Sequence, residues 1–199
     1  MSGATEILAN IGVAPERLKN ETQSLSQHLP LVAAHLSEWL ADAPDPVLAL
    51  ANWERLRDET PDPRVLEGWS AADWRPLLTL LGSSQSLANT LHGAGSAWPQ
   101  VFREARTAPR RQEAEHLAAL EGVFPAPWEE FESALRRYKH REYLRIGLAD
   151  LTGDYPVETT VAEVSALAAG LCDAAYHWAR ARLRGDFGEL VGEDGSPLG

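Results

Sequence analysis

The side chains of this sequence that could do chemistry are gathered most densely in a basic run between Leu135 and Gly153. The run holds five cationic side chains within ten residues: Arg136, Arg137, Lys139, Arg141 and Arg145. Guanidinium groups bind carboxylates and phosphates through paired hydrogen bonds, so such a run fits an anion site, a nucleic-acid groove or a docking surface. Arg137, Arg141 and Arg145 are spaced at i, i+4 and i+8 and therefore share one helix face. That face either docks another domain or an anionic surface, or is solvated and paired with nearby acids.

Arg111 and His116 are a second candidate, because their R-x4-H spacing resembles that of the all-α HEPN ribonucleases. In those enzymes the arginine and the histidine approach a scissile phosphodiester. The acidic neighbours Glu113, Glu115 and Glu121 disfavour RNA, so a HEPN-like ribonuclease is kept only as an alternative. Glu113 and His116 also match one ExxH half of a di-iron site, but the sequence contains no second ExxH. We therefore expect no metal ligands here.

The overall charge argues against nucleic acid as a partner. The 199 residues include 29 Asp and Glu against 18 Lys and Arg, which gives a formal net charge of −11. Such a surface repels phosphate backbones. No apolar run is long enough to cross a bilayer, and the N-terminus lacks the pattern of a secretory signal. The single cysteine, Cys172, fits a reducing compartment and is expected to be a buried small hydrophobe. We expect a cytoplasmic protein with no membrane contact.

The elements that must position these residues are helices, because apolar residues recur every three or four positions and no β-alternation of useful length occurs. Up to about residue 125 the helices are short and separated by breakers rich in proline and glycine. Pro46 fits the first turn of one helix, Ser70 fits the start of another, and Gly82 is expected to end it. Ser84 fits the cap of a further short helix.

Two long helices follow. The first is predicted to begin after Pro127 and to run for roughly 24 residues, because a stripe of mostly apolar residues recurs at helical spacing. Its members are Trp128, Phe131, Leu135, Tyr138, Glu142, Ile146 and Ala149. The second is predicted to start with a capping box from Thr160 to Glu163 and to end near Gly185. Its apolar stripe is Val161, Val164, Ala168, Leu171, Ala175 and Trp178.

A short polar turn joins the long helices, so we expect them to pack antiparallel with Trp178 buried between them. The predicted fold class is all-α: an irregular array of short helices followed by a long antiparallel helix pair. Along the chain this gives a short-helix region at 1–125, a helical hairpin at 126–185 and a flexible acidic linker at 186–199.

Two strings in the long helices resemble the glutamine-synthetase adenylyltransferase family. LRRYKHREYLRIGLADLTG at 135–153 and ETTVAEVSALA at 158–168 are similar to the family's LRR(F/Y)(R/K)xRExxRIxxxDL…ETxxExSxLA pattern. LLTLLGSSQSLANTLHGAG at 77–95 resembles an earlier LG-S-x-x-L-A-x-x-L segment of the family. The resemblance therefore covers about residues 77 to 178, and residues 1 to about 70 carry no recognisable pattern.

The resemblance implies an enzyme whose catalytic part is not in this sequence. Members of the family are bifunctional nucleotidyltransferases that use ATP and Mg²⁺. They attach AMP to a tyrosine of glutamine synthetase and remove it by phosphorolysis, under control of a PII signalling protein. Their catalytic signature resembles G-[MS]-G-K-L-G-x-x-E-L-N-x-x-S-D-x-D, and nothing here matches it. Glu193 and Asp194 are the nearest carboxylates, but they lack the lysine-bearing glycine turn.

The chain thus resembles the helical segment that precedes the first nucleotidyltransferase domain, with no catalytic, cofactor-binding or metal-binding residues of its own. Arg137, Arg141 and Arg145 are then expected to dock that domain, in cis or in trans. Glutamine synthetase and a PII protein are the other partners that the resemblance implies. The alternative is a freestanding helical interaction module that docks a separate catalytic chain.

Overall fold

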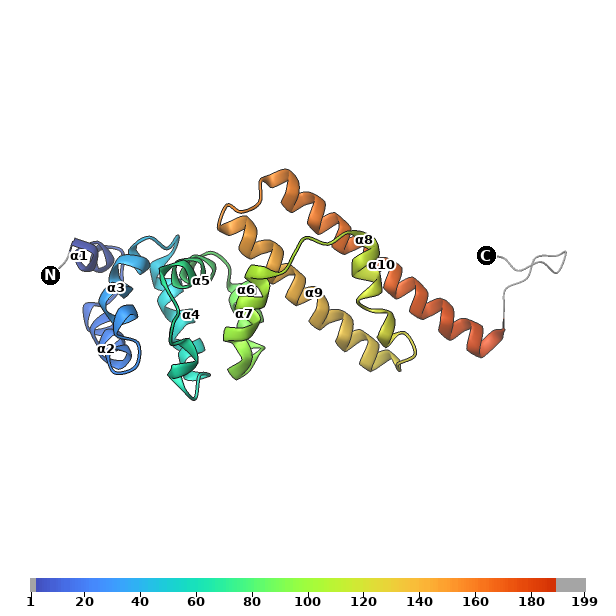
Figure 1. Cartoon of the computed structure of the whole chain (residues 1–199), viewed down its shortest axis with the longest axis horizontal. Helices are drawn as coiled ribbons and strands as arrows, with labels where there is room; N and C mark the ends of the chain where they lie inside the picture. The colour runs from blue at the N-terminus through green and yellow to red at the C-terminus, as the bar shows by residue number, and fades with distance from the viewer. Residues whose placement is uncertain (1–2, 189–199) are drawn as a thin grey trace. The chain divides into compact units, whose positions relative to one another are not determined.

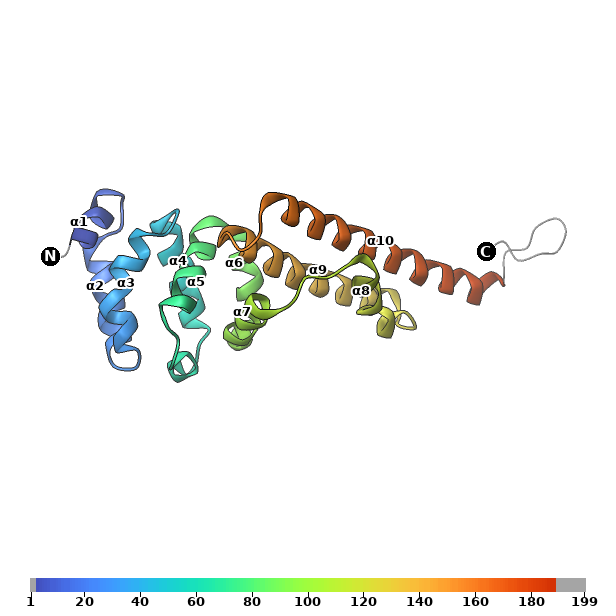
Figure 2. The same cartoon turned by 45° about the horizontal axis from the view of Figure 1, so that its top comes forward.

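The structure, a computed structural model, describes residues 3–188 and is all-α over that part of the chain, as predicted (Figures 1 and 2). Its α-helices are α1 (Gly3–Asn10), α2 (Pro15–Ser26), α3 (Pro30–Ala41), α4 (Pro46–Asp58), α5 (Ala71–Ser83), α6 (Gln85–His92), α7 (Trp98–Thr107), α8 (Glu113–Ala118), α9 (Trp128–Leu151) and α10 (Val157–Phe187). The short 3-10 helices are η1 (Pro63–Leu66), η2 (Gly95–Ala97) and η3 (Glu121–Val123). The long helix α9 has the 24 residues that its stripe predicts.

The chain folds into two compact units that interleave along the sequence. Within the described residues, the N-terminal unit contains 3–108 together with 143–156, and the C-terminal unit contains 109–142 together with 157–188. Helix α9 therefore contributes its first part to the C-terminal unit and its last part to the N-terminal unit. The sequence ranges 1–125 and 126–185 stay a prediction, and most of the expected linker at 186–199 lies outside the described residues.

The short helices of the N-terminal unit begin where the sequence predicts. Pro46 lies in the first turn of α4, and the side chain of Asp45 accepts a hydrogen bond from the backbone N–H of Leu48 at 2.9 Å. Ser70 and Asp73 form a capping box at the start of α5. These side chains satisfy backbone N–H groups that have no partner within the helix, which fixes where each helix starts.

Gly82 has a packing role beyond marking the end of α5, which comes one residue later at Ser83. A Cβ atom at Gly82 would lie 2.8 Å from the backbone oxygen of Asp45 and 3.3 Å from the Cβ of Ala49. The start of α4 therefore approaches the end of α5 more closely than any side chain would permit.

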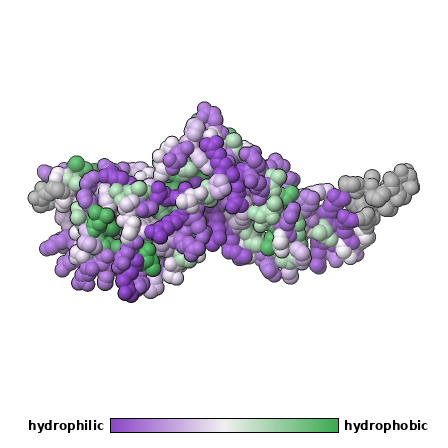
Figure 3. Space-filling model, viewed as in Figure 1, coloured by the Kyte–Doolittle hydropathy of each residue, from purple (hydrophilic) through white to green (hydrophobic). Residues whose placement is uncertain are grey.

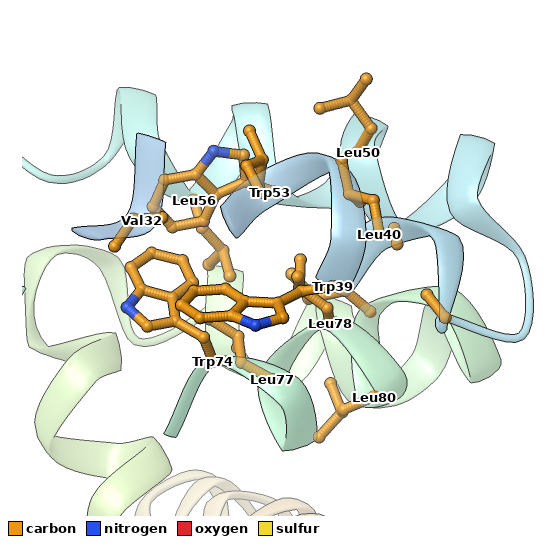
Figure 4. Packing of buried hydrophobic residues seen from close by; sticks show 14 of the residues in the cluster. Val32, Trp39, Leu40, Leu50, Trp53, Leu56, Trp74, Leu77, Leu78 and Leu80 are labelled. Carbon is orange, nitrogen blue, oxygen red and sulfur yellow. The ribbon is translucent and has the colours of Figure 1, made fainter. Parts of the chain in front are cut away.

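The core of the N-terminal unit is built around tryptophan rings (Figure 4). Trp53 on α4 is fully buried, and its ring lies edge-on to Trp74 at 4.8 Å and to Trp98 at 6.3 Å between centroids. Trp74 on α5 also stacks on Trp39 of α3 at 6.5 Å. Leucines from the same helices fill the space around the rings. These helices are therefore tied into one core by large rings whose geometry is specific.

A buried carboxylate, that of Glu21 on α2, accompanies this core. Glu21 is 3 % exposed, accepts a hydrogen bond from the indole nitrogen of Trp53 at 2.7 Å and is paired with Arg57. Burial raises the pKa of Glu21, while the bond from Trp53 and the charge of Arg57 act in the opposite direction. The core therefore tolerates the ionised form of this carboxylate only because Trp53 and Arg57 both bind it.

His92, the last residue of α6, is buried beside Glu59. Its Nδ1 lies 3.2 Å from Oε1 of Glu59, and only 6 % of its side chain is exposed. Burial lowers the pKa of His92, and the charge of Arg55 lowers it further, against the opposing effect of Glu59. Between the lowered pKa and the ordinary value of 6.5 the folded state binds fewer protons than the unfolded state. The contribution of His92 to stability is therefore complete above that ordinary value and is lost as the pH falls.

We expect the free energy of unfolding to fall between about pH 7.5 and pH 5, and to fall less in a His92→Gln variant, which cannot take up that proton. Urea titrations of both proteins across this range measure the difference. Comparing the two proteins cancels the contribution of Glu21, which has the opposite sign. If the free energies of unfolding of the two proteins changed in parallel with pH, the lowered pKa of His92 would be contradicted.

The C-terminal unit is organised by a close contact between α8 and α10. A Cβ atom at Gly170 would lie 2.5 Å from the Cβ of His116 and 2.9 Å from the backbone oxygen of Glu113. The buried side of α10 is made of residues at helical spacing: Glu163, Leu167, Gly170 and Ala174. Helix α8 therefore packs onto α10 along a path that Gly170 leaves open.

This packing corrects several expectations about α10. The predicted stripe is not its buried side, because Val161 is 60 % exposed and Ala168 is also exposed. Cys172 is exposed as well, and not buried. The helix begins at Val157, so Thr160 lies inside its first turn and does not cap it. The physical reason is that α8, which the stripe could not reveal, covers a different side of α10, centred on Leu167 and Gly170.

Trp178 is half-buried, and not enclosed as predicted. Its ring stacks on Phe131 at 5.3 Å and meets Trp128 at 5.1 Å, and its indole nitrogen donates to the backbone oxygen of Ala126 at 3.0 Å. The start of α9 thus contacts the second half of α10, as the antiparallel arrangement requires.

Candidate functional site

The basic run on α9 is divided by the fold. Arg137 and Arg141 are exposed one turn apart, whereas Arg145 is 2 % exposed and donates from Nη1 to the hydroxyl of Tyr155 at 3.2 Å. The structure therefore does not place Arg145 on an exposed face with the other two. The physical reason is that α9 passes from the C-terminal unit into the N-terminal unit. The same helix face is exposed at Arg137 and Arg141 in the first unit and is covered at Arg145 in the second.

The exposed part of the run has few partners within the described residues. Arg136 forms an ion pair with Glu132 at 2.6 Å, one turn earlier on the same helix. Arg137 donates to the hydroxyl of Ser133. None of the ion pairs and hydrogen bonds identified among the described residues involves Arg141. Arg137 and Arg141 therefore present their guanidinium groups to the surroundings, and their docking role stays a prediction.

A second constellation, which we call the polar cluster, joins α8, α9 and α10. Its members are Arg111, His116, Tyr138, Glu142 and Glu163. The hydroxyl of Tyr138 lies 2.8 Å from Nδ1 of His116 and accepts from Nη1 of Arg111 at 3.2 Å. Nε of Arg111 lies 3.6 Å from Oε1 of Glu142, and its backbone N–H faces Glu163 at 3.5 Å. Arg111 thus sits at the centre of the cluster.

The polar cluster is inside the fold. His116 is fully buried, and Glu142 and Glu163 are 6 % and 4 % exposed. The guanidinium of Arg111 also lies over the ring of Tyr138, 5.9 Å from its centroid. Because an ion pair in such a place loses its hydration, it persists only when its partners are well placed, and removing one partner is costly. The cluster can hold three helices together, and its histidine and its two carboxylates are buried away from solvent.

The R-x4-H pair does come together in space, through Tyr138. Full burial of His116 nevertheless keeps it from reaching a phosphodiester, and the carboxylates of Glu142 and Glu163 repel one. The geometry therefore gives the ribonuclease alternative no support. The sequence did carry a signal for the cluster, because Glu142 is the one charged member of an otherwise apolar and aromatic stripe.

We also searched the described residues for cavities, metal-binding groups and membrane-spanning helices. A cavity of about 800 Å³ lies beside α7 in the N-terminal unit and is lined by Arg103 and Arg106 among others. Arg106 is already paired with Asp73 at 2.8 Å, and Arg103 lies over the ring of Trp69 at 5.1 Å. Residues 3–188 hold no group of three or more His, Cys, Asp or Glu side chains able to bind a metal ion. They also form no helix with the length and apolarity needed to span a membrane.

Comparison with known proteins identifies the family to which this chain belongs. The sequence profile of the glutamate-ammonia ligase adenylyltransferase family matches residues 74–198. Searches of curated proteins and of solved structures found no significant match. The matched stretch starts in α5, contains the whole polar cluster and the basic run of α9, and continues beyond α10. It covers more than half of the chain, which therefore belongs to the glutamate-ammonia ligase adenylyltransferase family.

Proposed function

We propose that this chain is a helical part of a glutamate-ammonia ligase adenylyltransferase, and that it holds the nucleotidyltransferase domain without transferring AMP itself. The observation that carries the proposal is the burial of the polar residues in the string resembling the family pattern. Glu142, Arg145 and Glu163 are all at most 6 % exposed, and Glu142 and Glu163 face Arg111. Charged residues that are buried and paired inside the fold hold helices together and are not available to a substrate, which supports a scaffolding role.

Nucleotidyl transfer has requirements that the described residues do not meet. Mg²⁺ in such enzymes is held by carboxylates that remain open to the phosphates of the nucleotide. Glu142 and Glu163 face a guanidinium group inside the fold, so they do not fit ATP and Mg²⁺. The sequence also lacks the glycine-rich signature with its paired aspartates. The proposal therefore assigns ATP and Mg²⁺ to the nucleotidyltransferase domain.

The exposed arginines of α9 are candidates for contact with a partner domain. Arg137 and Arg141 are exposed beside buried members of the same string, and exposed arginines suit contacts with carboxylates of another domain. We propose that these two arginines meet the nucleotidyltransferase domain. Glutamine synthetase, a PII protein and a cytoplasmic location belong to the same proposal. A freestanding module would use this surface in the same way, with the catalytic domain on a separate chain.

The absence of transfer activity can be measured directly. We expect the purified chain, incubated with glutamine synthetase, Mg²⁺ and labelled ATP, to incorporate no more AMP than a control without the chain. Phosphate-dependent release of AMP from adenylylated glutamine synthetase should also stay at the control level. A complete member of the family, assayed in parallel, shows that the substrates are competent. Turnover by the chain alone would contradict the proposal.

A further inference from the structure

The cavity beside α7 is a candidate binding site that the proposed function does not use. Its volume is about 800 Å³, and all the residues that line it belong to the N-terminal unit. They come from η1, from the first turn of α5, from η2 and from one side of α7. Sites that hold small organic molecules typically have volumes of a few hundred to about a thousand cubic ångströms. The cavity therefore has the size that such a ligand needs.

Arg103 lines this cavity and has no hydrogen-bond acceptor among the described residues. In this it differs from the rest of the N-terminal unit. The other arginines of residues 3–108 and 143–156 donate to carboxylate, amide or hydroxyl oxygens: Arg17, Arg55, Arg57, Arg64, Arg75, Arg106 and Arg145. A guanidinium group carries its N–H donors in a planar fork that matches the two oxygens of a carboxylate. The fork of Arg103 is available to an oxygen ligand.

The ring of Trp69 supports the guanidinium group of Arg103. The distance from Cζ of Arg103 to the centroid of this ring is 5.1 Å, within the range of a cation–π contact. Trp69 is itself only 3 % exposed and stacks on Phe102 at 5.5 Å between centroids. A side chain that is already held in place loses less entropy when it binds a ligand. Arg103 is therefore partly preorganised for binding.

The cavity also has an apolar wall, formed by Val65 of η1, Ala97 of η2 and Pro99 of α7. Val65 is 49 % exposed, although its side chain is hydrophobic. Figure 3 shows the same mixture on the drawn face of the N-terminal unit, where hydrophobic surface lies between hydrophilic side chains. A ligand with an apolar part beside its charged group would cover Val65 and remove apolar surface from water.

Asp73 and Glu104 also line the cavity, and they limit the charge of the ligand. Both carboxylates already have a donor. Arg106 is paired with Asp73 at 2.8 Å, and Nε2 of Gln100 donates to Glu104 at 2.8 Å. Because Arg103 is the group that lacks a partner, an anion is favoured over a cation. Glu104, whose donor is neutral, repels a second negative charge, so a carboxylate fits better than a phosphate monoester.

We propose that the cavity beside α7 binds a small organic monocarboxylate. The carboxylate accepts paired hydrogen bonds from Arg103, and the apolar part of the ligand lies against Val65 and Pro99. This site belongs to the N-terminal unit and shares no residue with the exposed arginines of α9. The inference therefore does not depend on the proposed docking of a nucleotidyltransferase domain.

Benzoate is a suitable probe, because it joins one carboxylate to an apolar ring. Saturation-transfer NMR of the full chain measures its binding, together with that of benzamide and of phenyl phosphate. We expect a dissociation constant for benzoate in the millimolar range, as its small number of non-hydrogen atoms allows. Benzamide, which has the same shape without the charge, should bind at least about tenfold more weakly. Phenyl phosphate should also bind more weakly than benzoate.

Two substitutions test the roles of the charged residues. Arg103→Gln should raise the dissociation constant of benzoate by at least about tenfold and remove the preference for benzoate over benzamide. Glu104→Gln should reduce the preference for benzoate over phenyl phosphate, because it removes the carboxylate that repels the second charge.

Arg64→Gln is the matched control for Arg103→Gln. Arg64 is an exposed arginine of η1 that donates to Asp62 and does not line the cavity. Its replacement removes the same charge and should leave the binding of benzoate unchanged. Far-UV circular dichroism of each variant verifies that the helices are intact.

The proposal would be overturned by equal binding of benzoate and benzamide, or by benzoate binding that Arg103→Gln leaves unchanged. Absence of benzoate binding at tens of millimolar would overturn it as well.

Discussion

Replacing Trp53 by alanine is expected to lower the free energy of unfolding of the N-terminal unit by about 3–5 kcal/mol. The ring is fully buried, and it meets Trp74 and Trp98 edge-on. Its removal leaves a cavity where helices from three parts of the chain converge. It also removes the indole donor to Glu21, whose buried carboxylate then keeps only Arg57 as a partner among those described above. Urea titration followed by far-UV circular dichroism measures the change.

The two contributions of Trp53 can be separated with Trp53→Phe. Phenylalanine keeps an aromatic ring in the core but cannot donate to Glu21, so the loss should be about 1–3 kcal/mol, the cost of an unsatisfied buried acceptor. A variant that combines Trp53→Phe with Glu21→Gln should recover part of that loss, because an amide carries no charge to be compensated. A loss of less than about 1 kcal/mol for Trp53→Ala would show that the ring is not central to the core.

Replacing Gly170 by alanine is expected to destabilise the C-terminal unit by about 1–3 kcal/mol. The added Cβ would lie 2.5 Å from the Cβ of His116 and 2.9 Å from the backbone oxygen of Glu113, so α8 must move away from α10. Movement of α8 also disturbs the bond between His116 and Tyr138. Hydrogen exchange should accelerate in α8 and in the facing part of α10.

Gly185 supplies the matched control, because it lies on the same helix and no atom of the described residues would come within 4 Å of a Cβ added there. In a helix without such a contact, alanine is favoured over glycine by up to about 1 kcal/mol. Gly185→Ala should therefore leave stability unchanged or raise it, while Gly170→Ala lowers it. If both substitutions had the same effect, the close contact between α8 and α10 would be refuted.

The sequence predicts individual helices better than it predicts how they pack. The starts of α4 and α5 and the length of α9 follow from local rules, because capping residues, prolines and a stripe of large residues act within a few positions. Helix α10 is rich in alanine and apolar on more than one side, so periodicity alone could not identify its buried face. The true contact is made through Gly170 and Ala174, which leave room for α8 and carry little hydrophobic signal.

The candidate site was only partly accessible from the sequence for a related reason. Spacing places Arg137, Arg141 and Arg145 on one face of α9, but burial depends on what packs against each turn of the helix. Arg111 is far from Glu142 and Glu163 along the chain, and pairing between them requires the tertiary fold. The pairing of buried charges is therefore a long-range property that no local pattern contains.

We propose above that this chain acts by holding a nucleotidyltransferase domain through the exposed arginines of α9. Calorimetric titration of the chain with a separately produced nucleotidyltransferase domain from the family measures it most directly. In the chain alone, Arg137→Glu and Arg141→Glu should each change the free energy of unfolding by less than about 0.5 kcal/mol, because both side chains are exposed. The exposed Arg136, which already pairs with Glu132, provides the control Arg136→Glu.

We expect saturable one-to-one binding. The double variant of Arg137 and Arg141 should weaken it by more than about tenfold, equivalent to about 1.4 kcal/mol, and Arg136→Glu should have little effect. Absence of binding, or binding that the double variant leaves unchanged, would contradict the proposal.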